Sequence, residues 1–161
     1  MKKIIIALCL VAACLIDTSC SKKTDSGCTD VTVASEDAAM LAYINSKGIT
    51  ATRDNNTGLY YQVISQGTGA TPNVNNRVFV KYTGQLTNGT VFDQQQDHIK
   101  TGWILGTLIP GWQYGIPLIQ KGGKIKLIVP SSLGYGCNGS PGAIPANSVL
   151  VFDVELIEVL Q

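Results

Sequence analysis

The 161-residue sequence contains a single histidine, His98, and this shortage limits the chemistry open to the protein. One imidazole excludes a multi-histidine metal site, and we expect no metal ion. A Ser-His-Asp or Cys-His hydrolase needs a base beside its nucleophile, and the sequence also has no Gly-x-Ser-x-Gly turn. We therefore predict neither a metalloenzyme nor a covalent hydrolase, and we interpret His98 as an exposed loop residue.

Charged residues are also scarce. They make up 14% of the chain, and 12 Lys and Arg against 11 Asp and Glu leave a formal net charge of +1. A nucleic-acid surface needs a concentrated excess of Lys and Arg, so we expect no nucleic-acid partner. The glycines at 67–69 and 122–123 lack the spacing of dinucleotide or phosphate loops, so we expect no cofactor. With 45% hydrophobic residues, the chain has enough apolar material for one ordinary domain.

The sequence also lacks a hydrophobic run long enough to cross a bilayer comfortably, which takes roughly 20 residues. Its longest run covers residues 4–16, after a basic start at Lys2 and Lys3. A basic start followed by an apolar stretch of this size is typical of a secretory signal peptide, here residues 1–19.

Two cysteines compete as the end of this signal. Residues 11–14 match a bacterial lipobox, but Cys14 lies early in the chain, whereas Cys20 has better spacing and a polar sequence after it. We favour Cys20 and keep Cys14 as the alternative. Either cysteine would carry lipid and anchor the protein to a membrane without spanning it, in the bacterial cell envelope, facing the periplasm or the outer membrane. Cys28 and Cys137 remain, and the sequence leaves open whether they form a disulfide.

Residues 20–57 are predicted to form a tether that contains a short helix at about 35–47. Ser35 precedes acidic residues suited to a first helical turn, and Gly48 is a plausible end. The apolar stripe of this helix is expected at Ala38, Leu41, Ala42 and Ile44. The folded domain is predicted to cover residues 58–161.

From Gly58 onward the hydrophobic pattern has a period of two, which predicts antiparallel strands with one wet face. Asn88-Gly89 separates two such runs and predicts a hairpin. Trp112, Ile116 and Ile119 follow helical spacing instead, although Pro117 should shorten or distort that helix. The predicted class is α+β.

Five aromatic residues lie in or next to elements that should pack against this helix: Tyr82, Phe92, Trp112, Tyr135 and Phe152. Most such clusters are simply core. Asp93, however, directly follows Phe92, and Tyr135 stands in a Gly-Tyr-Gly loop, where a core residue is unusual. An aromatic pocket that also holds a carboxylate and a hydroxyl is a plausible site for an apolar ligand.

Several ordered motifs resemble those of FKBP-type peptidyl-prolyl cis-trans isomerases and cover essentially the whole folded region. They are VKYTGQLTNG at 80–89, VFD at 91–93, LIPGW at 108–112, LGYG at 133–136, IP at 144–145 and LVFDVEL at 150–156. The resemblance implies an antiparallel half-barrel sheet wrapped around one short α-helix, with proline bound between them.

The resemblance also implies roles for individual residues. Trp112 would form the floor of the pocket under the proline ring, and Asp93 would lie beside the twisting amide. The Tyr135 hydroxyl and the Ile109 N–H would bind substrate carbonyls. The expected catalytic residues are Tyr82, Phe92, Asp93, Tyr135 and Phe152, and the expected substrate-binding residues are Leu108, Ile109, Trp112 and Ile144.

The sequence departs from the family pattern near the pocket. The segment between Asp93 and Gly106 is shortened, with no aromatic residue before Trp103, and His98 stands where an arginine often pairs with the aspartate. Ser140 and Ala143 make the rim smaller and more polar. The expected activity is peptidyl-prolyl isomerisation on unfolded or exported polypeptides, with macrolides as possible ligands and a monomer as the default. The alternative is a non-catalytic proline-binding module, or chaperone, on the same fold.

Overall fold

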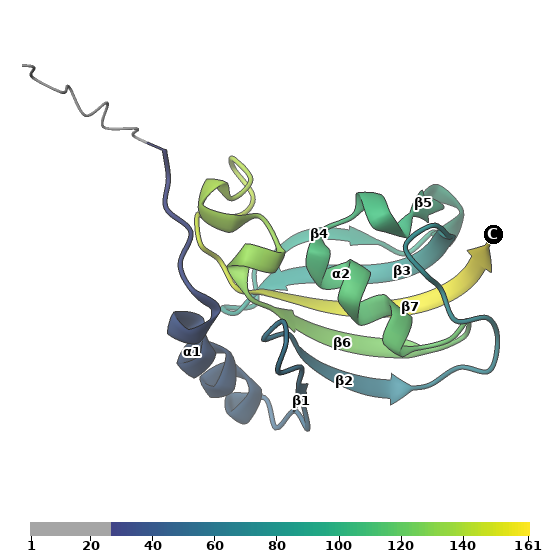
Figure 1. Ribbon diagram of the computed structural model, residues 1–161, viewed down its shortest axis with the longest axis horizontal. Coiled ribbons are helices and arrows are strands. Elements are labelled where there is room, and N and C mark those ends of the chain that lie inside the picture. The colour runs from purple at the N-terminus through teal and green to yellow at the C-terminus, as the bar shows by residue number, and fades with distance from the viewer. Residues whose placement is uncertain (1–26) are drawn as a thin grey trace, which may run out of the picture.

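The computed structural model describes residues 27–161, in which a curved antiparallel sheet carries one α-helix on each side (Figure 1). The expected signal peptide and both candidate lipid-bearing cysteines, Cys14 and Cys20, lie outside these residues. No helix within 27–161 is long and apolar enough to cross a membrane. The α+β class and the half-barrel sheet predicted from the sequence are confirmed.

Seven strands form the sheet in the order β1-β2-β6-β7-β3-β4, and β5 pairs with β3 outside this path. Their bounds are β1 Thr52–Arg53, β2 Tyr60–Ser65, β3 Arg77–Leu86, β4 Val91–Gln95, β5 Trp103–Ile104, β6 Lys124–Val129 and β7 Leu150–Leu160. Every pairing is antiparallel. The two long strands, β3 and β7, lie side by side through most of their length and form the centre of the sheet.

The period-two pattern predicted for β7 is confirmed. Leu150, Phe152, Val154 and Leu156 are all at most 3% exposed and face the inside of the curve, whereas Asp153 is exposed on the other face. The hairpin predicted at Asn88-Gly89 also forms, since it joins β3 to β4. Gly89 has a φ of +91°, a left-handed conformation that favours glycine.

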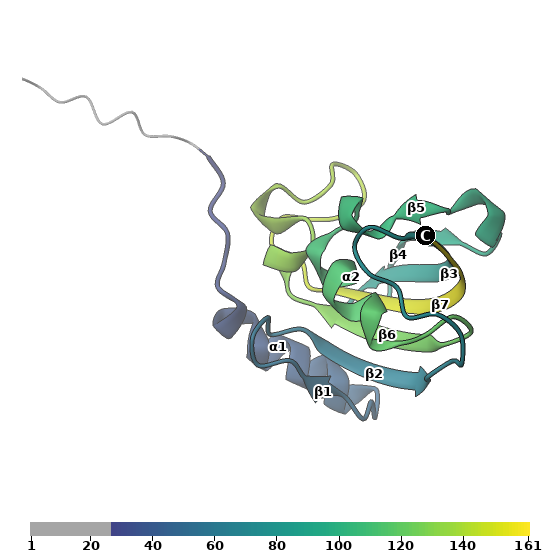
Figure 2. The ribbon, with the colours of Figure 1, turned by 45° about the vertical axis from the view of Figure 1, so that its right-hand side comes forward.

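Inside the curve lies α2, Pro110–Gly115 (Figure 2). It begins at Pro110, whose fixed φ suits the first helical position and whose missing N–H would have no partner there. A 3-10 turn, Ile116–Leu118, continues the helix and contains Pro117. The helix is therefore short, as the proline predicted, and Trp112, Ile116 and Ile119 are all buried against the sheet.

The other helix, α1 (Val33–Ser46), lies outside the curve. It begins two residues earlier than predicted, because the Thr32 side chain caps it by accepting from Ser35 N–H. Leu41, expected in its apolar stripe, is 40% exposed. Ala38 and Ala42 are exposed as well, so only Ile44 of the predicted stripe is buried. Ile44 packs together with Met40 and Tyr43 against Tyr60, Ile128 and Val151 on the outer face of the sheet.

Two elements N-terminal to residue 58 thus belong to the packed unit. α1 covers part of the sheet, and β1 pairs with β2. A third connection lies further upstream, where Cys28 and Cys137 form a disulfide across a sequence separation of 109 residues. The structure therefore resolves the question of pairing that the sequence left open. From Cys28 onward, the region expected to be a tether is attached to the domain.

Candidate functional site

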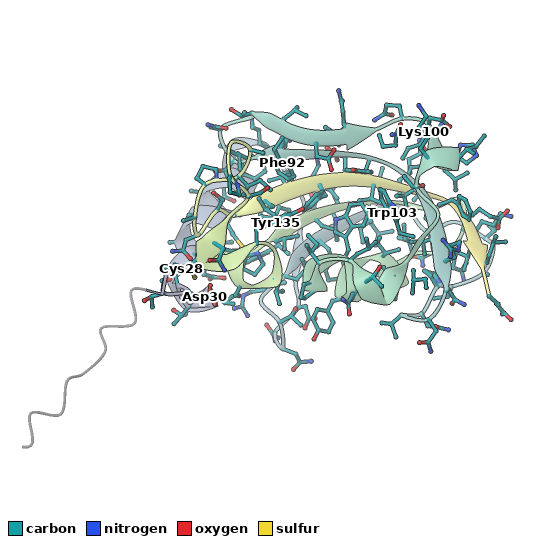
Figure 3. All side chains as sticks on the ribbon, turned by 90° about the horizontal axis from the view of Figure 1, so that it is seen from above. Cys28, Asp30, Phe92, Lys100, Trp103 and Tyr135 are labelled. Atoms are coloured by element: carbon teal, nitrogen blue, oxygen red, sulfur yellow. A yellow bond between two sulfur atoms is a disulfide. The ribbon has the colours of Figure 1, made fainter. Side chains whose placement is uncertain are left out.

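A cavity of about 170 Å³ lies between the inner face of the sheet, α2 and the loop that follows β6. Nine residues line it: Tyr82, Phe92, Asp93, Trp103, Leu108, Ile109, Trp112, Tyr135 and Phe152. Eight of the nine residues predicted for the site are thus in one place, apart from Ile144. Figure 3 labels Phe92, Trp103 and Tyr135, which reach this site from three different segments of the chain.

The cavity walls form a continuous series of aromatic contacts. Trp112 stands edge-on to Tyr82, with ring centres 5.1 Å apart, and edge-on to Phe152 at 5.4 Å. Phe152 in turn contacts Phe92 at 5.6 Å, and Tyr82 contacts Trp103 at 6.0 Å. Edge-to-face pairs of this kind fix ring orientation and add about 0.5–1.5 kcal/mol beyond burial. The pocket is therefore preorganised.

A β-bulge explains how neighbouring residues Phe92 and Asp93 both line the cavity. Consecutive side chains of a regular strand point to opposite faces. In the β3–β4 ladder, Gly84 pairs with Asp93 and Gln85 pairs with Val91, so Phe92 has no partner of its own. The extra residue bends the strand and turns the ring of Phe92 to the same side as the Asp93 carboxylate.

Gly84 makes room for the two phenylalanine rings. A Cβ atom at this position would lie 2.8 Å from the ring atoms of both Phe92 and Phe152. No real Cβ approaches that closely, so any larger residue would displace a ring. Gly84 belongs to the VKYTGQLTNG motif but was not among the residues predicted for the site.

Asp93 is held by Tyr82. The Tyr82 hydroxyl donates a hydrogen bond of 2.6 Å to Oδ2 of Asp93. Burial raises the pKa of Tyr82 well above its usual value, and the bond to the Asp93 carboxylate raises it further. Tyr82 therefore stays protonated and keeps donating throughout the physiological range. Asp93 itself is exposed to solvent, and it lines the cavity.

Tyr135 stands across the cavity, between two 3-10 turns, Ser131–Leu133 and Gly136–Asn138. Tyr135 is 40% exposed. Partial burial raises the pKa of its hydroxyl, and the negative charge of Asp93 raises it further. Tyr135 is thus a neutral hydrogen-bond donor at the cavity rim.

Ile109 supplies a second donor. It is the residue that caps α2, and its carbonyl accepts from Trp112 N–H at 2.9 Å. Within residues 27–161 its own N–H has no hydrogen-bond partner. The buried indole N–H of Trp112, at the cavity floor, is likewise without a partner in this part of the chain.

Two expectations need revision, and one residue of the site was missed. Ile144 does not line the cavity; it is buried in the core, and its N–H and carbonyl bond to Ser140. His98 does not replace an arginine beside Asp93, because it lies in a 3-10 turn next to Phe79 and Glu158. Trp103, in contrast, was not assigned to the site. Its strand, β5, has only two residues, which are too few to show a period-two pattern in the sequence.

The outer face of the sheet has a larger hollow of about 290 Å³, lined in part by Lys81, Lys124 and Glu155. Its charged lining does not suit an apolar ring, so the aromatic cavity remains the candidate site. Within residues 27–161 no cluster of three His, Cys, Asp or Glu side chains is placed to bind a metal ion.

Comparison with known proteins identifies the family. The sequence profile of the FKBP-type peptidyl-prolyl cis-trans isomerases matches residues 69–157, more than half of the chain. The chain is a member of this family. Residues of the aromatic cavity all fall within the matched segment.

Individual FKBP-type proteins agree with this assignment. The isomerase FkpA of Aeromonas hydrophila is 45% identical over 121 residues, which are 74% of this chain and 44% of that relative. The crystal structure of FkpA from Escherichia coli superimposes with a TM-score of 0.68 at 38% identity, covering 80% of this chain and 61% of that one. A Pseudomonas syringae isomerase structure gives a TM-score of 0.67 at 29% identity, with coverages of 83% and 99%. The matched part of this chain therefore covers 44% of the Aeromonas FkpA and 61% of the Escherichia coli FkpA in the crystal structure, less than two thirds of either.

Proposed function

We propose that this FKBP-type protein accelerates cis–trans isomerisation of X-Pro bonds in exported polypeptides. The observation that carries the proposal is the aromatic cavity with a carboxylate and two hydrogen-bond donors at its rim. The family membership supports the same reading.

The mechanism requires no covalent step. Rotation about an amide bond faces a barrier of about 18–20 kcal/mol, which comes from resonance. A twisted amide has lost that resonance and is less dipolar than the planar form, so an apolar pocket favours it relative to the ground state. Trp112 and Phe152, at most 4% exposed, supply this environment for the proline ring. Catalysis then arises from tighter binding of the transition state than of either planar isomer.

The polar groups hold the chain while the bond turns. The Tyr135 hydroxyl and the Ile109 N–H donate to substrate carbonyls near the proline, which holds the substrate chain in the cavity while the bond turns. Asp93, kept in place by Tyr82, provides a fixed negative charge beside the amide. In this mechanism Asp93 acts through its field and its hydrogen bonds, with no proton transfer.

The test is isomerisation of a proline tetrapeptide, followed by NMR exchange, with Phe92→Ala and Asp93→Leu as variants. The Phe92 ring is half-buried, and covering it fully with the proline ring is worth at most about 1.5–3 kcal/mol of apolar contact, which Phe92→Ala removes. The expected fall in kcat/KM for Phe92→Ala is therefore about ten- to hundredfold. Tyr114→Ala is the matched control, because Tyr114 is an aromatic residue of α2 that is 51% exposed and outside the cavity. If Phe92→Ala and Asp93→Leu catalyse as well as Tyr114→Ala and the wild type, the site assignment is rejected.

Prevention of aggregation without any rate enhancement would point instead to the alternative, a non-catalytic binding module that uses the same cavity. We also propose that macrolides compete for the cavity and that the protein acts as a monomer.

For location, we propose the bacterial cell envelope, with residues 1–19 as the signal peptide and a lipid on Cys20. The basic start and the apolar run of residues 4–16 support this proposal. Mass spectrometry of the protein purified from membranes, with Cys20→Ala and Cys14→Ala as variants, tests which cysteine carries the lipid. Loss of the lipid only in Cys14→Ala would reject Cys20.

A further inference from the structure

The segment of residues 28–36, which we call the strap, runs along the loop that carries Tyr135. We call that loop, residues 131–147, the rim loop. Three consecutive strap residues contact it. Cys28 is disulfide-bonded to Cys137, the Thr29 carbonyl accepts from the Asn147 side chain at 3.3 Å, and Asp30 Oδ1 accepts from Cys137 N–H at 2.7 Å. In Figure 3, Cys28 and Asp30 lie at the same end of the molecule as this loop.

The Asp30 carboxylate also packs closely against Gly136. Gly136 has a φ of +56°, and a Cβ atom at that position would lie 2.6 Å from Asp30 Oδ1. The carboxylate therefore sits directly against the backbone of the residue that follows Tyr135. A glycine is required there for two reasons, the left-handed backbone and the space taken by Asp30.

The other end of the strap holds the start of the rim loop. Glu36 is 7% exposed, and its Oε2 accepts from Ser131 N–H at 2.9 Å. Glu36 belongs to α1, which is fixed to the outer face of the sheet through Met40, Tyr43 and Ile44. The strap is thus anchored independently of the rim loop and binds the loop on both sides of Tyr135.

We propose that the strap is a positioning element for the proline-binding site: it holds Tyr135 in the conformation that donates to the substrate. The inference rests on the proposed isomerase function. The strap lies outside the segment that the family profile matches, and none of its residues lines the cavity. Tyr135 is the one cavity residue in the rim loop, so its hydroxyl is the group that the strap controls.

The test measures KM and kcat separately for a proline tetrapeptide, using the complete purified protein with its disulfide formed. Asp30→Ala removes the acceptor for Cys137 N–H and loosens the loop. If the productive arrangement falls to between a third and a tenth of the population, KM rises about three- to tenfold while kcat changes little. Asp37→Ala is the matched control, since Asp37 binds Arg53 and Tyr60 and makes no contact with the rim loop.

Reduction provides a second, independent perturbation. A dithiol such as dithiothreitol transfers two electrons and two protons, which convert the Cys28–Cys137 disulfide to two thiols as the reagent closes to its own disulfide. The same rise in KM is expected. A Cys28→Ala/Cys137→Ala protein should have the raised KM without any reductant, and its KM should not respond to dithiothreitol. This control shows whether the effect of dithiothreitol comes from the Cys28–Cys137 disulfide or from another cysteine.

A double-mutant cycle distinguishes positioning from general destabilisation. In a Tyr135→Phe background the hydroxyl is gone, so Asp30→Ala should have little further effect on KM. An unchanged KM in Asp30→Ala, an equal rise in Asp37→Ala, or full additivity with Tyr135→Phe would each overturn the proposal. A wild-type protein without isomerase activity would instead reject the proposed function, so the two failures are distinguishable.

Discussion

The Tyr82 hydroxyl and the Asp93 carboxylate, 2.6 Å apart, couple the buried wall of the cavity to its one charged group. Tyr82 is 7% exposed and stands on the central strand β3, whereas Asp93 is exposed on β4. The aromatic core of the sheet therefore determines where the negative charge of the site lies.

This pair predicts a pH dependence of stability. The folded protein raises the pKa of Tyr82 above its ordinary value of 10.0, so it holds the phenolic proton more tightly than the unfolded chain does. The resulting stabilisation is complete below pH 10 and is lost as the pH rises further. Urea unfolding at pH 9–11 should show a steeper loss of stability for the wild type than for Tyr82→Phe. Parallel pH profiles would contradict the coupling.

Gly84→Ala should abolish most isomerase activity, because the new Cβ displaces Phe92 or Phe152 from the cavity wall. Overpacking of this kind costs about 1–3 kcal/mol of stability. Gly122→Ala is the control of similar cost: its φ is +85° but nothing lies within 4 Å of the added Cβ. Gly122→Ala should unfold more easily than the wild type but retain wild-type kcat/KM. If Gly84→Ala is as active as Gly122→Ala, Gly84 is not needed for the site.

Intrinsic fluorescence should report ligand binding directly. The whole sequence has two tryptophans, Trp103 and Trp112, and both line the cavity. Titration with a proline peptide or with rapamycin should therefore change the tryptophan emission. Trp103→Phe should remove part of the change and weaken binding a fewfold, since the Tyr82–Trp103 edge contact is altered. A titration that detects binding by calorimetry but leaves the emission unchanged would place the ligand elsewhere.

The disulfide should contribute measurably to stability. Cys28 and Cys137 close a loop with a sequence separation of 109, and bridges across long loops typically contribute about 2–4 kcal/mol. Cys28→Ala/Cys137→Ala should lower the free energy of unfolding by that amount in chemical denaturation. If the double variant is as stable as the oxidised wild type, the strap is held by its hydrogen bonds alone.

The central strands could be predicted from the sequence because their faces differ in chemistry. In β7, Phe152 is buried and Asp153 is exposed, and this alternation specifies both the strand and its orientation. The hairpin was likewise predictable, since the glycine of Asn88-Gly89 meets the requirement for positive φ locally.

The remaining features depend on contacts between distant parts of the chain. Of the predicted stripe of α1 only Ile44 is buried, because the helix packs on a surface that exists only when β2, β6 and β7 are paired. The bulge at Phe92 depends on the register between β3 and β4, which no local pattern encodes. The family motif indicated Asp93, but only the structure explains how its side chain and that of Phe92 reach the same cavity.

The disulfide also limits how far the domain can move from a membrane. If the lipid is on Cys20, as we propose, only eight peptide steps separate the anchor from Cys28, where the chain joins the domain. Those steps can reach at most about 29 Å. A connection that began at residue 58 would reach several times further. The domain would then work within about its own diameter of the bilayer, with the rim loop at the attached end. Polypeptides would therefore encounter the proposed proline-binding cavity close to the membrane surface.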